Sequence, residues 1–394
     1  AGMLSWGACH IVGGSAEERE ALAKAQEELV EKVQAEIDRL GVETDGRGWR
    51  AKVFLYCVEA RCPQTGWKVP LLPTRVISKG YRVIAELVPD PTNKRYDIIV
   101  RTGVTEKELV EAEKGTVRND GRGQDPYMVH TVDGVEYRTK ISTLRGDYRK
   151  DDGSTGNKLR LWEKGDFKPR PEDIFQERLY AILWMRPKKE GRGYEYQFRS
   201  VTEADLERER IVEEYIAKNL AEWQGKGWIP DMRIEPGVET ERLYRERGWT
   251  YWHHLFNPRQ LMYFGSVKKA LEELSRPSSL YVFFAKGLDW NSRISRWNPR
   301  WDKTENVFYN QALNTLFNYG TRGFIFLAET LRVEAKSFPI SAQTHVGVHP
   351  ADQLKTVSDI FITDPPYGDA VKFEEILEFF IAWLRKNPPK EFAN

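Results

Sequence analysis

Residues 356–367 read Thr-Val-Ser-Asp-Ile-Phe-Ile-Thr-Asp-Pro-Pro-Tyr, an apolar run that leads directly into two consecutive prolines. The run at 356–363 has the β-branched and aromatic content of a strand. Pro365 and Pro366 fix φ and lack N–H donors, and the residue before each proline is pushed towards an extended conformation. The stretch therefore predicts a strand that ends in a stiff loop with its carbonyl groups held in fixed directions.

The loop also carries groups that suit one kind of ligand. Asp364 and the carbonyl of Pro365 can each accept a hydrogen bond from an amino group, and Tyr367 offers a ring on which a planar base can stack. This set fits the exocyclic amine of a base that has been rotated out of a duplex. The alternative is an ordinary strand end followed by a proline-stiffened loop.

The strand and Asp364-Pro365-Pro366-Tyr367 together resemble the amino-methyltransferase motif of DNA methylases that modify adenine N6 or cytosine N4. From about Trp49 onward the chain looks like large adenine-specific DNA methylases with a zinc-ribbon-like insert, which are often found in anti-phage or restriction-modification settings. Four segments carry this wider resemblance: CPQTGWKVPL at 62–71, RGDY at 145–148, FQERLY at 175–180 and LFNPRQL at 255–261.

The resemblance implies S-adenosylmethionine as cofactor and DNA as substrate. Members of that family hold the cofactor on a glycine-rich strand–turn–helix before the insert, and the nearest approach here is Ile11-Val12-Gly13-Gly14-Ser15. That segment has a short apolar lead-in and no third glycine, so it matches a nucleotide-binding turn poorly. We therefore expect the cofactor site to be incomplete in this chain, with the missing half on a second polypeptide or a missing segment.

Bulk properties place the chain among globular proteins of two or three domains. It has 394 residues, 40% of them hydrophobic and 30% charged, and a net charge of +1. Any DNA-binding surface must then be a local patch. Three cysteines, the absence of a signal-peptide pattern and the lack of a long apolar run predict a cytoplasmic protein.

The pattern along the chain predicts an α/β protein with part of a methyltransferase-type sheet near its C-terminal end. Residues 1–45 are expected to form an amphipathic connector helix, with Ser15 and Glu18 as a capping box and Gly41 as the stop. Residues 46–257 predict a β-rich α+β insert that recognises the target DNA. Residues 258–394 predict part of the catalytic domain, with the Asp-Pro-Pro-Tyr motif at a strand end, where ligands bind in such sheets.

Several elements are expected within these regions. Strands are predicted around 53–56, 82–88, 96–100, 179–184 and 194–198, with loops over 117–156. Helices are predicted at 106–114, from Thr202 to about 223, and from the Asn257-Pro258 start signal to about 274. The last region predicts strands at 279–284 and 340–348, a helix at 304–319 and a helix at 373–386.

Residues 290–303 form the segment most typical of DNA binding. Arg293, Arg296 and Arg300 alternate with Trp297 and other tryptophans, and arginine contacts phosphates and base edges while tryptophan stacks on exposed bases. The alternative is a loop packed by its tryptophans, with the arginines in salt bridges.

Metal binding is not expected. Cys57 and Cys62 are separated by four residues, as in a zinc site, but no nearby histidine completes the usual four ligands, so a ribbon that has lost its metal is favoured. The pairs His345/His349 and His253/His254 are interpreted as packed or solvated histidines.

These observations predict a DNA amino-methyltransferase, adenine N6 first, or the portion that holds its target-base motif. Asp364, Pro365, Pro366 and Tyr367 are the expected catalytic residues, with Asp364 and the Pro365 carbonyl orienting the amine and Tyr367 stacking on the base. The alternative is a non-catalytic DNA-binding or assembly subunit of an anti-phage defence system, which keeps the motif without the cofactor site.

Overall fold

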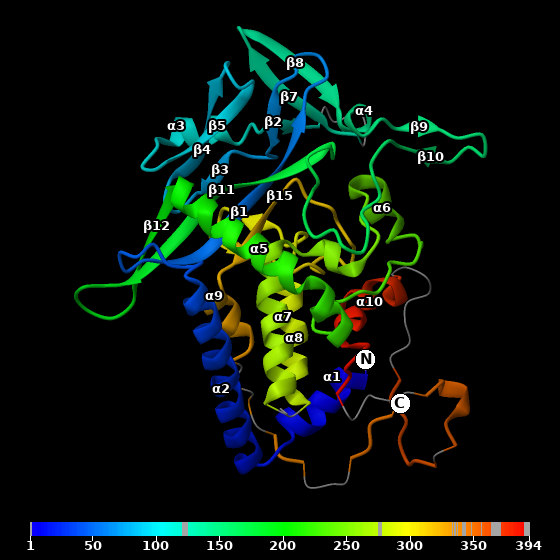
Figure 1. Cartoon of the computed structure of the whole chain (residues 1–394). Helices are drawn as coiled ribbons and strands as arrows, with labels where there is room; N and C mark the ends of the chain where they lie inside the picture. Colours follow the sequence, from blue (N-terminus) through cyan, green and yellow to red (C-terminus); the bar gives the residue numbers. More distant parts are fainter. Residues whose placement is uncertain are drawn as a thin grey trace.

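A mixed sheet and a set of long helices make up the fold, as seen in a computed structural model (Figure 1). The structure describes residues 2–119, 125–274, 278–332, 334, 336, 338–340, 344–347, 349–355, 357–363 and 372–389. The expected α/β class is confirmed at the level of a mixed sheet with helices.

The central sheet has eight strands in the order β12-β11-β1-β2-β5-β4-β3, with β15 also paired to β1. Every described pairing in it is antiparallel except that of β2 with β5, where Lys68 lies opposite Arg95. The strands are β1 (Arg50–Arg61), β2 (Lys68–Leu71), β3 (Val76–Ser78), β4 (Val83–Asp90), β5 (Arg95–Arg101), β11 (Phe175–Pro187), β12 (Tyr194–Ser200) and β15 (Asn318–Arg322).

All five strands expected in the insert are present, because each has the β-branched and aromatic residues that fill a half-buried pleated surface. Strands β1 and β11 are longer than expected and form the centre of the sheet, with Phe54 opposite Ile182. Short helix α3 (Glu106–Ala112) lies at the predicted position, capped by Thr105.

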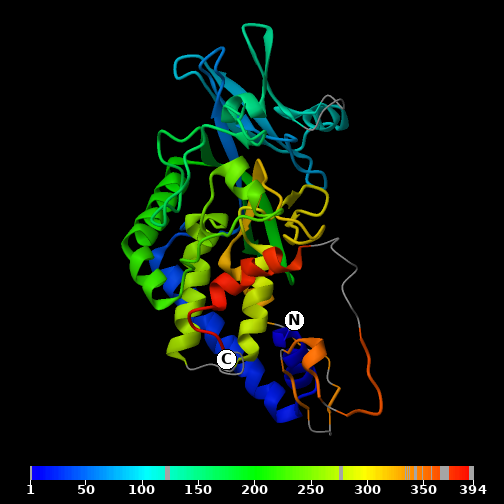
Figure 2. The ribbon, with the colours of Figure 1, turned by 90° about the vertical axis from the view of Figure 1, so that its right-hand side faces the viewer.

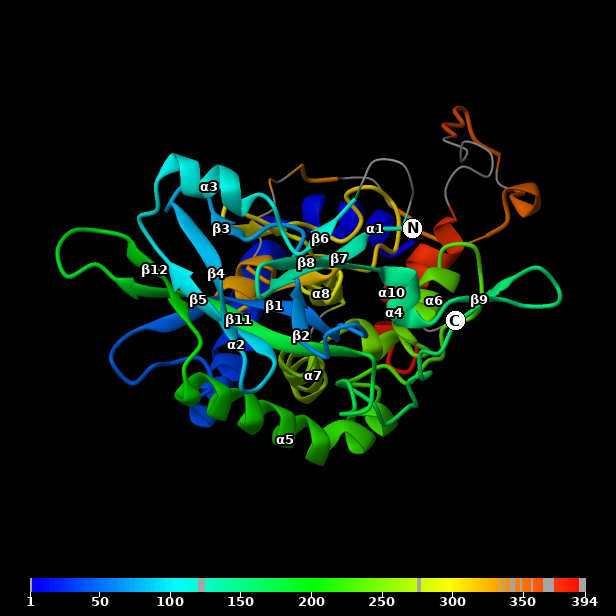
Figure 3. The same ribbon diagram turned by 90° about the horizontal axis from the view of Figure 1, so that it is seen from above.

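The stretch 117–156 corrects an expectation, since it contains more than loops. It forms a small sheet of β6 (Val117–Arg118), β7 (Tyr127–Val132) and β8 (Val135–Lys140), then α4 (Ile141–Arg145) and the hairpin β9 (Tyr148–Arg149) with β10 (Thr155–Gly156). Asp133 and Gly134 connect β7 to β8 with φ of 50° and 76°, as a tight hairpin turn of this hand requires. Figure 3 shows the β9–β10 hairpin projecting at the end of the molecule opposite the β11–β12 hairpin.

The long helices lie below the sheet in Figure 1 and begin where the sequence predicts. Ser15, Thr202 and Asn257 each cap a helix through a capping box, and Gly41 ends the first of them with φ of 68°. These helices are α2 (Ala16–Leu40), α5 (Glu203–Lys226) and α7 (Pro258–Glu273). Helix α7 is buried on most sides, and a Cβ at Gly265 would lie 2.1 Å from the Trp223 ring, so glycine is required for α5 and α7 to approach.

The largest core cluster takes residues from all three predicted regions of the chain. Leu29 and Val33 of α2, Phe256 and Phe264 around α7, and Trp383 near the C-terminal end are all buried in it. The domain boundaries predicted at 45/46 and 257/258 therefore remain a prediction. Side chains from both sides of each boundary pack together in this cluster.

The region after α7 differs most from expectation. Residues 279–284 belong to helix α8 (Ser279–Trp290) rather than a strand, and 304–319 is not a helix but contains β14 (Lys303–Thr304) and the start of β15. Strand β14 pairs with β13 (Trp297–Asn298). The described residues of 340–348 form no strand. Helix α10 (Phe373–Leu384) confirms the last predicted helix.

Short helical pieces complete the description: α1 (Gly2–Gly7), a π-helical turn η1 (Ala8–Val12), α6 (Glu241–Arg247), η2 (Trp252–Leu255), α9 (Phe324–Leu327), η3 (Ala328–Thr330) and η4 (Ala351–Gln353). Element η4 and the chain around it lie outside the helical layer (Figure 2). In the part of the chain that is described, no helix is long and apolar enough to span a membrane.

Candidate functional site

The Asp-Pro-Pro-Tyr motif at 364–367 lies outside the described residues. Its approach segment, 357–363, is described and forms neither helix nor strand, so the strand expected there is absent from the structure. Its large apolar side chains face solvent, with Val357 97% and Ile362 93% exposed. The predicted strand has no neighbouring strand to pair with in the described part of the molecule.

Helix α10, which follows the motif, is firmly anchored. The carboxylate of Glu375 accepts hydrogen bonds from the backbone N–H groups of Val238, Glu239 and Thr240, at 2.8 to 3.0 Å. Phe379 and Trp383 are buried, and both rings contact the Phe256 ring. The motif is therefore followed by a helix whose position is fixed by the core.

The expected DNA-binding segment divides into a buried and an exposed part. Arg293 is only 1% exposed and Trp297 is buried, with its indole N–H donating to the carbonyl of Ile77. The assignment of these two residues to a DNA-binding surface was wrong, because the fold uses both side chains inside. Arg296 and Arg300 remain exposed, beside the rings of Tyr309 and Trp301.

Arg293 is held by partners that are distant in sequence. Its Nε and Nη2 donate to the two carboxylate oxygens of Glu177 at 2.8 Å each, and Nη1 donates to the carbonyls of His254 and Phe256. A two-point ion pair with full hydrogen bonding is the arrangement that lets a guanidinium be buried. The arginine thus joins strand β11 to the start of α7.

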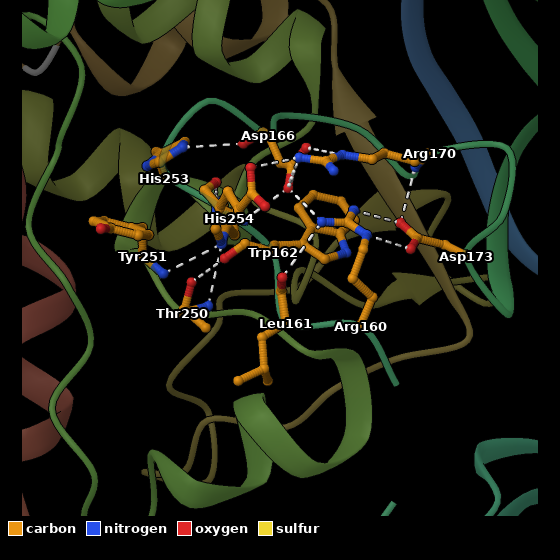
Figure 4. Close-up of polar contacts among 11 residues, drawn as sticks. Arg160, Leu161, Trp162, Asp166, Arg170, Asp173, Thr250, Tyr251, His253 and His254 are labelled. Carbon is orange, nitrogen blue, oxygen red and sulfur yellow. Dashed lines mark hydrogen bonds and ion pairs between the residues drawn. The ribbon is translucent and has the colours of Figure 1, made fainter. Parts of the chain in front are cut away.

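A polar network lies next to this ion pair and is drawn in Figure 4. Arg160 donates to both oxygens of Asp173 at 2.7 Å and to Asp166 at 2.6 Å, and Arg170 also donates to Asp166. Burial alone would raise the pKa of Asp166, but the Glu163 N–H and the two guanidinium groups lower it below its ordinary value. The network fixes the loop that leads into β11.

The side chains of His253 and His254 form hydrogen bonds with backbone carbonyls of the same loop. The Nδ1 of His254 accepts hydrogen bonds from the N–H groups of Thr250 and Tyr251, so its Nε2 carries the proton and donates to the Glu163 carbonyl at 3.0 Å. Burial lowers the pKa of His253 to about 4 and that of His254 well below its usual range. Both imidazoles are neutral and enclosed near pH 7, which suits a structural role and not proton exchange with a substrate.

The cavity beside this network is too small for a base. It measures about 30 Å³ and is lined by Arg160, Glu177, Arg247 and Arg293 among others. That is the space of roughly one water molecule. The Figure 4 cluster is therefore interpreted as part of the core.

The cysteines do not form a metal site with the described residues. Cys57 and Cys62 are free and buried, and burial raises the pKa of the Cys57 thiol well above its ordinary value. Among the described residues, no group of three or more His, Cys, Asp or Glu side chains could hold a metal ion. His345 and His349 lie in a described stretch without helix or strand.

Residues 11–15, the segment most similar to a cofactor-binding loop, lie among the described residues. Gly13 and Gly14 follow the π-helical turn η1 and precede α2, so no strand leads into them. A nucleotide-binding turn of the Rossmann type needs a strand at that place. The described residues thus contain no cofactor loop at 11–15.

One polar surface was missed by the sequence reasoning. Arg242, Arg245 and Arg247 on α6, with Arg145 on α4, line a groove of about 620 Å³. The signal that could have found it is the repeated arginine in ERLYRER at 241–247.

Searches of family models, of curated proteins and of solved structures each gave no match for this chain.

Proposed function

We propose that this chain carries the target-base part of an S-adenosylmethionine-dependent DNA amino-methyltransferase, with adenine N6 as the first candidate atom. The observation that carries the proposal is the sequence Asp364-Pro365-Pro366-Tyr367 at the end of an apolar segment. Few arrangements supply an amine acceptor, a fixed carbonyl and a stacking ring within four residues.

The exposure of 357–363 supports this proposal. Ile360 is 77% and Phe361 is 65% exposed, in addition to Val357 and Ile362. An exposed run of this composition is an aggregation hazard unless another surface covers it. We infer that it becomes a strand when the cofactor-binding half, on a second polypeptide or an added segment, supplies neighbouring strands.

The anchoring of α10 gives the motif a defined attachment. Glu375, Phe379 and Trp383 fix the helix that follows it, while the large apolar side chains of the described segment 357–363 are exposed. Positioning is the main contribution such an enzyme makes, because a base amine must be held in line with the methyl donor. An anchored helix on one side restricts where the motif can lie.

In the proposed reaction the flipped adenine stacks on Tyr367. Its N6 amine donates hydrogen bonds to Asp364 and to the Pro365 carbonyl, and Pro366 keeps the loop rigid. These bonds direct the nitrogen lone pair towards the methyl group, which S-adenosylmethionine supplies when bound. Region 46–257 is proposed to recognise the DNA, together with exposed Arg296 and Arg300.

A second candidate is a non-catalytic DNA-binding or assembly subunit of an anti-phage defence system. It is favoured by the central sheet, whose described pairings are antiparallel apart from β2–β5. Sheets that bind S-adenosylmethionine or dinucleotides in a crevice are mostly parallel. Under this reading the motif would serve assembly and not catalysis.

The test uses labelled S-adenosylmethionine and DNA with the chain alone and with the chain joined to its cofactor half. The methylase proposal expects label in N6-methyladenine only in the joined form. Hydrogen exchange gives a second readout, because amides of 357–363 should exchange fast in the chain alone and slowly in the joined enzyme. Absence of label in a well-folded joined form would favour the subunit reading.

A further inference from the structure

The groove beside α6 is a polar hollow to which the motif argument gives no role. It is lined by residues of α4 and α6, by Thr155 of β10 and by residues within 314–317. Figure 1 shows α6 below α4 and the β9–β10 hairpin. At about 620 Å³ the groove can hold several ligand groups in a row. Its lining is rich in guanidinium, hydroxyl and amide groups.

Arg247 is a buried cation without a carboxylate partner among the described residues. Its side chain is 7% exposed, its Nη1 and Nη2 donate to the carbonyls of Glu246 and Leu316, and its Nε has no partner. The rings of Phe175 and Phe317 lie 5.3 and 4.9 Å from the guanidinium carbon. Burial lowers the pKa of Arg247 to about 10, although the negative charges of Glu246 and Glu177 act in the opposite direction.

Arg242 is the second guanidinium without a described acidic partner. Its Nη1 donates to the side-chain oxygen of Asn314 at 2.7 Å, which orients it across the groove. Arg245 is exposed and reaches Glu246 only at 3.5 Å. Of the three arginines on this short helix, Arg242 and Arg247 therefore lack a direct ion pair among the described residues, while Arg245 has a long one.

The acidic groups of the groove already have other partners. Asp147 forms a two-point ion pair with Arg145 at 2.7 and 3.0 Å. The carboxylate of Asp125 accepts from Ser142, and that of Glu246 accepts from the Thr315 hydroxyl. Asp125 and Glu246 keep their negative charge, because a hydroxyl does not neutralise a carboxylate, and Glu246 also lies 3.5 Å from Arg245. Four arginines and three acids line the groove, which leaves it a net charge of +1.

The rim adds one further positive charge. Lys158, just after the β9–β10 hairpin, is exposed, and its backbone N–H donates to the carbonyl of Arg145. The exposed Arg149 and Lys150 of the hairpin are balanced by the exposed Asp151 and Asp152. Guanidinium, hydroxyl and amide donors along a basic groove are the groups that contact phosphate oxygens and sugars of nucleic acids. The backbone of a DNA strand carries a negatively charged phosphate at every nucleotide, so it can contact several groups between the rim and Arg247. A single small anion cannot.

We propose that this groove binds the phosphodiester backbone of DNA through Arg242 and Arg245, with the buried Arg247 as a fixed positive charge at its floor. The inference deepens the proposed function, since it names the surface that would hold the substrate of that enzyme. The groove proposal does not depend on the chemistry of the Asp-Pro-Pro-Tyr motif. A failure of the groove proposal would appear in DNA binding, and a failure of the methylase proposal would appear in methyl transfer.

The experiment measures binding of a short fluorescein-labelled DNA duplex by anisotropy, with salt raised from about 50 to 200 mM. Arg242→Glu/Arg245→Glu is compared with Lys189→Glu/Arg192→Glu, an equal change of net charge on the exposed β11–β12 hairpin at the opposite end (Figure 3). We expect the groove variant to bind at least ~10-fold more weakly and its salt slope to fall by about two units. The hairpin variant should bind within about twofold of the unmodified chain.

The assignment would be overturned by no DNA binding by the unmodified chain, by normal binding by the groove variant, or by an equal loss in both variants. Arg242→Lys should retain most binding, which separates loss of charge from loss of fold. Polyglutamate of matched charge should displace the DNA much more weakly than unlabelled DNA does, and equal displacement would contradict a phosphodiester site. Methyl transfer lost in Asp364→Ala with intact DNA binding would leave the groove assignment untouched.

Discussion

Arg293 and Glu177 form a two-point ion pair, with Nε–Oε1 and Nη2–Oε2 both at 2.8 Å, across 116 residues of sequence. The pair joins the central strand β11 to the segment that precedes β13. It changes the interpretation of 290–303, because the most enclosed arginine of that segment stabilises the fold and does not face DNA.

Removing Glu177 should destabilise the protein strongly. Glu177→Ala leaves the Arg293 guanidinium buried without its carboxylate, and breaking such a pair from one side costs about 3–5 kcal/mol of unfolding free energy. Urea unfolding measures it. Glu207→Ala is the control, since its partner Arg210 is exposed and the pair contributes little. Similar unfolding free energies for the two variants would contradict the role given to the Arg293–Glu177 pair.

The exposed arginines of the same segment should act on DNA binding and not on stability. Arg296→Ala/Arg300→Ala is expected to lower the salt slope of DNA binding by up to about two units, near one for each lost phosphate contact. The unfolding midpoint should stay unchanged because both side chains are exposed. A salt slope equal to that of the unmodified chain would mean that these arginines serve only the rings of Tyr309 and Trp301 beside them.

Acid should weaken the fold through its buried histidines. The pKa of His253 is lowered to about 4, so between pH 6.5 and 4 the unfolded chain binds a proton that the folded chain does not. Stability must then fall as the pH falls through this window, by about 2 kcal/mol at pH 5 from His253 alone. Urea unfolding at pH 7 and pH 5 measures the loss, and His253→Gln should reduce it. An equal loss in that variant would assign the pH dependence to other groups.

The chain alone should bind S-adenosylmethionine weakly or not at all. Gly13 and Gly14 follow a helical turn and not a strand, and the described sheet is mainly antiparallel. Calorimetric titration tests this directly, with the joined enzyme as the positive control. Micromolar binding by the chain alone would reveal a cofactor site that neither the sequence nor the fold indicates.

Local signals explain where sequence reasoning succeeded. Ser15, Thr202 and Asn257 begin helices because a side-chain oxygen satisfies a free N–H of the first turn, and that bond is specified within four residues. The β strands of the insert are equally local, since alternation and β-branched content fix them. The Asp133-Gly134 turn is the same kind of local signal for β7 and β8, although it lies in a stretch rich in turn-forming residues.

The failures have long-range causes. The apolar run at 279–284 fits a buried strand or a buried helix, and only tertiary packing of α8 decides between them. Gly320 directly follows the helix predicted at 304–319, but it lies in β15, where a Cβ would be 2.6 Å from the Thr304 side chain. The burial of Arg293 depends on Glu177, whose proximity no local pattern encodes.

The groove arginines illustrate the same division. The sequence shows three arginines on α6, yet a solvated charged helix face is the ordinary outcome of such a pattern. What distinguishes Arg247 is its burial between Phe175 and Phe317 with no described carboxylate partner, and those rings come from distant parts of the chain.

The Asp-Pro-Pro-Tyr motif makes the central claim testable by substitution in the complete enzyme. Tyr367→Ala should mainly weaken capture of the flipped base, since stacking contributes roughly 1–3 kcal/mol per base. Its effect should appear as weaker binding of DNA with a pre-flipped or mismatched target, with little change in the unfolding midpoint. Tyr367→Phe is the control and should retain capture, because the ring is preserved.

The most direct measurement is the rate of methyl transfer to DNA by the complete enzyme carrying Asp364→Ala, with its unfolding midpoint recorded beside it. Loss of the acceptor that orients the amine should lower the rate by about two orders of magnitude or more, as for other preorganised polar contacts, while the midpoint changes little. Near-normal methyl transfer by the folded variant would contradict the role given to Asp364 and would leave the non-catalytic subunit as the better account.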